Sequence, residues 1–144
     1  PHERGFVDAM VAASLPVLKA SKGRAFMLFT SYAMLHRVAQ KMRDYPEWNL
    51  FIQGQAPRGE LIDRFRASPD AVLLGTASFW EGVDIQGEDL SCVIIDKPPF
   101  APPNDPVMSA RLKKLEEAGG KPFFEVQVPD AIISLKHGAG RLIR

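Results

Sequence analysis

The stretch AFMLFTSYAMLHRVAQKMR, residues 25 to 43, decides the fold class of this chain. Its first six residues, 25 to 30, are almost entirely apolar, which is typical of a short strand buried on both faces of a sheet. Residues 31 to 43 then place apolar side chains at helical spacing, and Ser31 is a typical N-cap. A strand that leads directly into an amphipathic helix is the repeating unit of α/β proteins.

The same alternation continues on both sides of this unit. Further strands are expected at 49–54, 71–77 and 90–97, and helices at 6–20 (kinked at Pro16), 58–67, 108–120 and 129–144. The proline-rich segment 98–106 predicts a loop. We therefore expect one three-layer α/β domain over residues 1–144, with a mostly parallel sheet covered by helices on both faces.

Composition bounds the class of protein. Of the 144 residues, 46% are hydrophobic and 24% charged, which is typical of a globular domain. The net charge of +1 means that any phosphate binding depends on local clusters. The single cysteine, Cys92, excludes an internal disulfide and a cysteine metal cage, so we expect it to be a small buried residue and expect no metal site. No apolar run spans a membrane and no signal pattern is seen, which predicts a cytoplasmic location.

Polar residues follow three of the expected strands. They are Thr30 with Ser31, the stretch GTASFWEGVD at 75–84, and Asp96 with Lys97. Ligands of open α/β sheets bind at the carboxyl ends of strands. Hydroxyl and N–H groups at a helix start suit a phosphate, so Thr30 and Ser31 are candidate phosphate ligands. The alternative is that Ser31 is only an N-cap.

The stretch 75–84 combines hydroxyl groups with aromatic rings. Thr76, Ser78 and Trp80 could serve single-stranded nucleic acid, which offers bases for stacking and phosphates as acceptors. Gly82 would let a ligand approach the backbone closely. Asp84 is a candidate for holding a ribose hydroxyl or orienting a basic partner. The alternative is a core tryptophan beside a glycine turn.

The C-terminal stretch SLKHGAGRLIR, 134 to 144, carries two arginines. On a helix, His137, Arg141 and Arg144 share one face. Two guanidinium groups without an intervening acid suit an anion with several oxygens, such as a polyphosphate; the alternative is a solvated basic face. The chain has no glycine-rich phosphate loop ending in Lys-Ser/Thr. The arginines would therefore reach a nucleotide that is held elsewhere, as an arginine finger does.

Together these segments resemble the second RecA-like motor domain of superfamily 2 helicases, in particular the DinG/YoaA branch of the XPD-like DNA helicases. Residues 23–32 resemble helicase motif IV, residues 75–106 motif V and the loop after it, and residues 131–144 motif VI, whose pattern is Gln-x-x-Gly-Arg-x-x-Arg. The resemblance runs over essentially the whole chain, with the three motifs in order.

The resemblance implies ATP-driven 5′-to-3′ unwinding of DNA in repair or replication. Its partners would be single-stranded and forked duplex DNA, and a first RecA-like domain that holds most of the ATP and Mg²⁺. By this resemblance the catalytic residues are Arg141 and Arg144. The residues on the ATP side are Gly82, Asp84, His137, Arg141 and Arg144. The residues that contact DNA are Thr30, Ser31, Thr76 and Ser78, with Gln53 and Trp80 as further candidates for the same groove.

The chain departs from the family pattern in three ways. His137 stands where motif VI usually has Gln, and a neutral His retains one donor and one acceptor. The phosphate-binding loop, the acidic metal-binding motif and the cysteines of the iron–sulfur domain are absent, and Cys92 is not one of those cysteines. The sequence also ends within motif VI. We therefore expect a truncated domain that is inactive alone, with any iron–sulfur cluster elsewhere in a longer protein.

Two other functions remain open from the sequence. One is a stand-alone nucleic-acid-binding module, which would bind single strands with a steep salt dependence. The other is a degenerate RecA-like domain kept as an interaction scaffold, for which His137 in place of Gln is the supporting feature. Substitution of the arginines would leave the function of a scaffold intact.

Overall fold

Helices and strands alternate along the first two thirds of the chain. The computed structural model describes residues 2–82, 85, 89–96, 110, 113–114, 123–129 and 131–136. The elements are α1 (His2–Ser21), β1 (Ala25–Phe29), α2 (Tyr32–Met42), β2 (Asn49–Ile52), α3 (Arg58–Ala67), β3 (Ala71–Thr76), α4 (Ala77–Glu81), β4 (Cys92–Asp96), β5 (Phe123–Val128) and β6 (Ala131–Lys136). The expected strands and helices up to residue 96 are confirmed, with ends shifted by a few residues.

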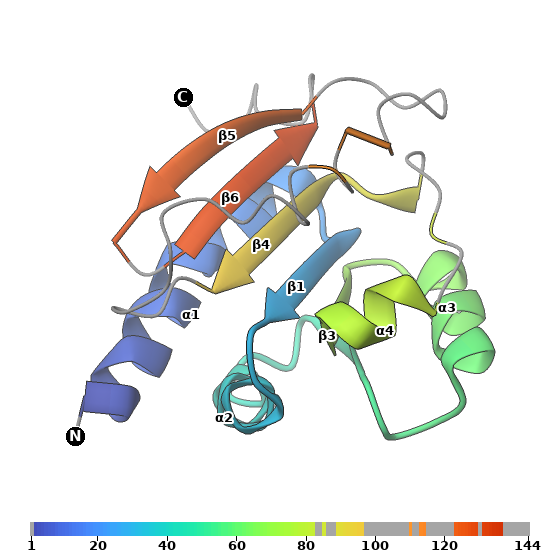
Figure 1. Cartoon of the computed structure of the whole chain (residues 1–144), viewed down its shortest axis with the longest axis horizontal. Helices are drawn as coiled ribbons and strands as arrows, with labels where there is room; N and C mark the ends of the chain where they lie inside the picture. The colour runs from blue at the N-terminus through green and yellow to red at the C-terminus, as the bar shows by residue number, and fades with distance from the viewer. Residues whose placement is uncertain are drawn as a thin grey trace.

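The described strands form one six-stranded sheet in the order β2-β3-β1-β4-β6-β5 (Figure 1). The strands β2, β3, β1 and β4 are parallel to one another, with Phe29 opposite Thr76 and Leu28 opposite Ile95. The strands β6 and β5 complete the sheet in antiparallel pairing. The expected α/β fold is confirmed, and the parallel part of the sheet is the part that the strand–helix alternation predicted.

Helices cover both faces of the sheet. Residues of β1 alternate between the two cores: Met27 and Phe29 pack with α1 and α2, whereas Phe26 and Leu28 pack with α3 and α4. All five residues of β1 are buried. This two-sided burial explains why the strand is apolar throughout instead of alternating with polar residues. The three-layer arrangement of the prediction is therefore present in the described part of the chain.

The turn between α1 and β1 depends on a glycine. The N–H of Gly23 donates to the Leu18 carbonyl at 2.9 Å and so closes the helix. Gly23 has a φ of +74°, and a Cβ there would lie 2.7 Å from the backbone of Asp70. Both the conformation and the space therefore require glycine, as expected from its position after the helix.

The expected helix over 129–144 is wrong where the structure describes it. Residues 131–136 form β6, which pairs with β4 on one side and β5 on the other, and Pro129 lies in the turn between β5 and β6. The β-branched Ile132 and Ile133 favour this extended conformation. Residues 137–144 lie outside the described residues, as does the expected loop 98–106. Of the expected helix 108–120, the structure describes Ala110, Lys113 and Lys114, all helical.

Cys92 lies in the core at the start of β4. It is 0% exposed, which confirms the sequence prediction of a small buried residue. Its sulfur lies 3.6 Å from the Ser21 hydroxyl, and burial raises the pKa of its thiol to about 12. Within the described residues, no helix combines the length and the apolar character needed to cross a bilayer.

Candidate nucleic-acid interface at the strand ends

The four parallel strands end along one edge of the sheet, and polar residues gather there. Because β1, β2, β3 and β4 run in the same direction, the residues that follow them lie at the same edge. The structure brings together the sequence candidates Thr30, Ser31, Gln53, Thr76 and Ser78, joined by Tyr32 and Asp96. We call this set the strand-end cluster. Its hydrogen bonds link β1 to β4 and β2 to β3.

Asp96, the last residue of β4, clamps the end of β1. Its carboxylate oxygens accept hydrogen bonds from the Thr30 backbone N–H at 3.0 and 3.2 Å, and Oδ2 also accepts from the Thr30 hydroxyl at 3.0 Å. The Asp96 side chain is buried while Thr30 is exposed. The clamp holds the chain extended at the point where Thr30 and Ser31 face solvent.

Burial gives Asp96 an unusual protonation behaviour. Desolvation raises the pKa of its carboxyl from 3.8 to about 6, against the lowering effect of the two kinds of hydrogen bond from Thr30. The folded state therefore holds a proton at Asp96 over a pH range in which the unfolded chain has released it. The stability that this proton contributes is present below pH 3.8 and is lost as the pH rises through about 6.

Asp96→Asn tests this linkage. We expect the unfolding free energy of the unaltered chain to fall by about 2 kcal/mol relative to Asp96→Asn between pH 4 and pH 7, because asparagine keeps an acceptor for Thr30 without titrating. Urea unfolding of both proteins at four pH values in this range measures the difference. A constant difference across the range would contradict the raised pKa.

A second set of hydrogen bonds joins the ends of β2 and β3. Gln53, just after β2, uses Oε1 to accept from the Thr76 backbone N–H at 2.8 Å and from the Thr76 hydroxyl at 3.1 Å. The Thr76 and Ser78 hydroxyl oxygens lie 2.9 Å apart. Gln53 and Thr76 are partly buried, and Ser78 is exposed. Sequence reasoning included all three, and the structure places them in one network.

The start of α2 presents one hydroxyl and one aromatic ring at the same edge. The Ser31 hydroxyl oxygen accepts from the Met34 N–H at 3.1 Å, so the N-cap interpretation is confirmed. Tyr32 is 44% exposed, and its hydroxyl donates to the Gln53 carbonyl at 3.1 Å. A Cβ at Gly54, whose φ is +95°, would collide with this hydroxyl. Sequence reasoning missed Tyr32, although an aromatic residue directly after two hydroxyl residues was a usable signal.

Trp80 is not part of this edge. Its side chain is 6% exposed and stacks on the buried ring of Phe26, with ring centroids 5.2 Å apart and an interplanar angle of 18°. The ring face needed for a base is therefore occupied by the core. The structure favours the alternative of a core tryptophan, and the exposed ring at the strand-end cluster is Tyr32.

Gly82 ends α4, a short helix that the sequence reading did not separate from the stretch 75–84. Its φ is −89°, so its backbone does not require glycine. The absence of a side chain at Gly82 instead leaves room for the guanidinium of Arg58, with which a Cβ at this position would overlap. Arg58 is the first residue of α3, where a cation is disfavoured by the helix dipole. A positive charge at this unfavourable position in the sequence could have indicated that Arg58 is a candidate binding residue.

The other nucleotide-side candidates, Asp84, His137, Arg141 and Arg144, lie outside the described residues. Within the described part of the chain, no group of three or more His, Cys, Asp and Glu side chains is arranged to hold a metal ion. Arg58 places its guanidinium beside Gly82, and guanidinium groups can bind phosphate oxygens with directed hydrogen bonds.

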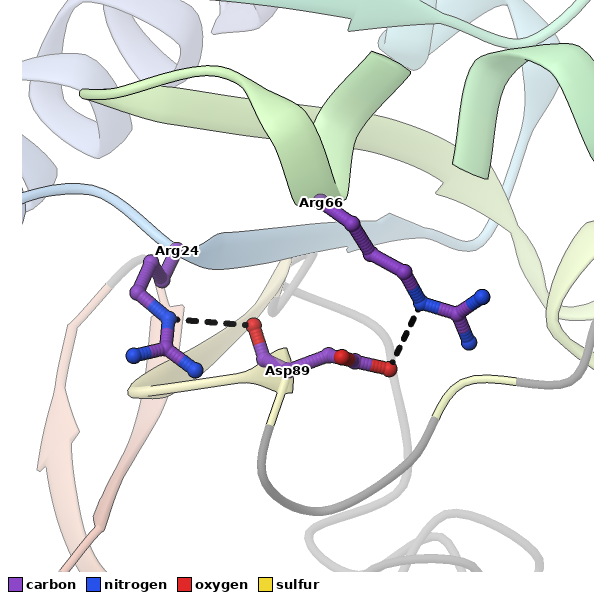
Figure 2. Close-up of polar contacts among 3 residues, drawn as sticks. All are labelled: Arg24, Arg66 and Asp89. Atoms are coloured by element: carbon purple, nitrogen blue, oxygen red, sulfur yellow. Dashed lines mark hydrogen bonds and ion pairs between the residues drawn. The ribbon is translucent and has the colours of Figure 1, made fainter. Parts of the chain in front are cut away.

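A different polar cluster lies at the amino ends of the strands. The Arg66 Nε donates to the Asp89 carboxylate at 3.0 Å, and the Arg24 Nε donates to the Asp89 backbone carbonyl at 3.5 Å (Figure 2). These residues, with Lys22 and Asp70, line a cleft of about 510 Å³. The contacts tie the end of α3 to the segments before β1 and β4. They lie at the sheet edge opposite the strand-end cluster.

The fold and the strand-end cluster define an α/β domain of RecA-like type, with hydrogen-bonding groups, some exposed and some buried, at the carboxyl ends of its parallel strands. The sequence profile of the helicase C-terminal domain family matches residues 14–144. The chain belongs to this family. The expected kinship with the DinG/YoaA branch is confirmed by relatives of both names.

Three relatives illustrate this branch. The chain is 45% identical over 143 residues to the ATP-dependent DNA helicase YoaA of Escherichia coli (strain K12), covering 99% of this chain and 22% of the relative. It is 46% identical to the YoaA of Haemophilus influenzae, covering 90% of this chain and 20% of that protein. It is 34% identical to the ATP-dependent DNA helicase DinG of Photobacterium profundum, covering 100% of this chain and 22% of the relative. The chain thus spans about a fifth of these relatives.

Proposed function

We propose that this chain serves as the second motor domain of an ATP-dependent DNA helicase. The observation that carries the proposal is the strand-end cluster, which places the exposed Ser31 hydroxyl and the partly buried Gln53 amide at the carboxyl edge of the sheet in a helicase-family domain. Hydrogen-bond donors of this kind suit a sugar–phosphate backbone. Single-stranded DNA, and forked duplex DNA during 5′-to-3′ unwinding, are the proposed partners.

The nucleotide part of the proposal rests on the family resemblance. Arg141 and Arg144 would bind the terminal phosphate of ATP, with Gly82, Asp84 and His137 on the same side. ATP with Mg²⁺ would be held mainly by a first RecA-like domain, and an iron–sulfur cluster would belong to a region outside this chain. When bound, the nucleotide supplies the free energy of phosphoryl transfer. The two arginines stabilise the charge that develops on the phosphoryl oxygens.

A role in DNA repair, in the cytoplasm, follows from the same resemblance.

Translocation would couple the nucleotide-binding arginines to the strand-end cluster that holds DNA. When the arginines are drawn toward a nucleotide on another domain, the strand-end cluster moves as a unit with the sheet, because its members are bonded to β1, β3 and β4. DNA held by the cluster therefore advances relative to the other domain. A rigid cluster is needed for this step, since loose side chains would let the strand slip.

A two-piece reconstitution tests the proposal. We expect phosphate release from ATP only when this chain is mixed with a phosphate-loop-bearing first motor domain of the same branch and with single-stranded DNA. The chain alone should release none, because it has no phosphate-binding loop. DNA-stimulated hydrolysis by the chain alone would contradict the proposal.

The reconstitution also separates the rival functions. If pieces that are folded and associated release no phosphate, salt-dependent binding of single-stranded DNA by the chain would favour a nucleic-acid-binding module. The absence of both phosphate release and DNA binding would favour an interaction scaffold.

A further inference from the structure

The direction of each hydrogen bond in the strand-end cluster follows from one backbone group. The Thr76 N–H can only donate, and it lies 2.8 Å from the Gln53 side chain. The Gln53 oxygen must therefore face Thr76, which turns the amide nitrogen Nε2 away from it. This orientation is set by the backbone of β3 and not by the choice of side-chain rotamer.

The donor and the acceptor in each hydrogen bond of the β3 and α4 hydroxyls can then be assigned. Because Gln53 Oε1 is an acceptor, the Thr76 hydroxyl, 3.1 Å away, donates to it. The Thr76 hydrogen is thereby used, so Ser78 must be the donor in the contact between the two hydroxyl oxygens at 2.9 Å. Ser78 thus donates to Thr76, and Thr76 donates to Gln53. Both hydroxyls present only lone pairs to solvent.

Two more hydroxyl hydrogens point into the protein. Thr30 donates to the Asp96 carboxylate at 3.0 Å, and Tyr32 donates to the Gln53 carbonyl at 3.1 Å. A phosphate oxygen can only accept hydrogen bonds at neutral pH. In this arrangement the side-chain hydroxyls of Thr30, Tyr32, Thr76 and Ser78 therefore offer a phosphate no hydrogen, and their outward lone pairs would repel it.

Two side chains of the cluster keep hydrogens for a ligand. Ser31 uses a lone pair to cap α2, none of the described residues accepts its O–H hydrogen, and the residue is exposed. Gln53 keeps both hydrogens of Nε2, for which the described residues provide no acceptor. Ser31 follows β1 and Gln53 follows β2, two parallel strands of the sheet that are separated by β3.

We propose that Gln53 and Ser31 are the groups of this edge that bind DNA phosphates, and that Thr30, Thr76 and Ser78 position them instead of touching the DNA. This assignment rests on the proposed function and deepens it. Gln53 is the centre of the arrangement, because Thr76 orients its oxygen while Tyr32 holds its backbone carbonyl. The hydroxyl residues that a helicase motif would suggest as DNA ligands thus serve to orient the Gln53 side-chain amide.

Gln53→Glu tests the proposal with little change of shape. Glutamate keeps an oxygen for Thr76 but removes both Nε2 hydrogens. Gln55→Glu adds the same charge to an exposed position in the same turn and is the matched control. Binding of a fluorescein-labelled oligothymidine to the 144-residue chain is measured by fluorescence anisotropy at one fixed salt concentration. We expect Gln53→Glu to bind at least about tenfold more weakly than Gln55→Glu, from the loss of charge-assisted hydrogen bonds.

Ser78→Ala supplies the opposite test. Ser78 is exposed and donates only within the cluster, so its loss should weaken DNA binding by no more than about twofold. Equal binding by Gln53→Glu and Gln55→Glu, or a loss in Ser78→Ala as large as that in Gln53→Glu, would overturn this assignment and leave the proposed function standing. Failure of the unaltered, folded chain to bind the oligonucleotide would overturn the DNA role of the edge and this assignment with it.

Discussion

Substituting Arg144 with alanine is expected to lower phosphate release in the two-piece reconstitution by about 10³-fold or more, the size of effect seen when arginine fingers are removed. The reason is electrostatic. Phosphoryl transfer spreads negative charge over the transferred oxygens, and a guanidinium supplied across a domain boundary stabilises that charge at the moment of reaction. Arg141→Ala is expected to act in the same direction. Initial rates of phosphate release at saturating ATP and single-stranded DNA measure both variants.

Two further variants make this result specific. Arg144→Lys keeps the charge but not the planar fork of donors, so we expect partial activity between the unaltered chain and Arg144→Ala. Arg43→Ala removes an exposed arginine at the end of α2, which faces the amino ends of the strands, and should leave turnover unchanged. Circular dichroism confirms that each variant is folded. Full turnover by Arg144→Ala would remove Arg144 from the nucleotide site.

Phe26→Ala is expected to cost about 3–5 kcal/mol of unfolding free energy, a large part of the stability of a domain of this size. Phe26 is 0% exposed in β1, where its ring stacks on Trp80 and contacts the edge of Phe79, 6.2 Å away between centroids. A Cβ at Gly75 would lie 3.2 Å from the Phe26 ring. The space is thus closely filled, and truncation leaves a cavity that its neighbours cannot close.

Phe26→Leu is the matched control. Leucine keeps most of the apolar volume and should cost about 1 kcal/mol. Urea unfolding followed by tryptophan fluorescence measures both variants, since Trp80 lies against the substituted ring. A loss below about 1 kcal/mol for Phe26→Ala would show that the contacts of this core do not carry the stability assigned to them.

Local patterns along the chain were sufficient for the parallel part of the fold. The segment 25–43 alone predicts a buried strand, a serine cap and an amphipathic helix, and all three are present. The burial of Cys92 followed from its place in an apolar run. The gathering of Thr30, Thr76 and Asp96 at one edge followed from the direction of parallel strands. These predictions succeed because each depends on residues close in sequence, or on the direction of a strand.

Long-range pairing decided the rest. The run AIISLK at 131–136 is compatible with a helix or a strand when it is considered alone, and it becomes β6 because β4 and β5 supply its backbone hydrogen bonds. Trp80 turns inward because Phe26, far away in the sequence, offers a ring to stack on. The choice between a nucleic-acid ligand and a core residue therefore could not be made from the stretch 75–84.

The sequence by itself determined the fold class, the family and most of the polar residues at the strand ends. Only the tertiary structure decided which of those residues keep a hydrogen for a phosphate. The donor in each contact depends on partners from other strands: Asp96 for Thr30, and Gln53 for Thr76. A sequence motif names hydroxyl groups, but the direction of a hydroxyl hydrogen is set by the acceptor that the fold places beside it.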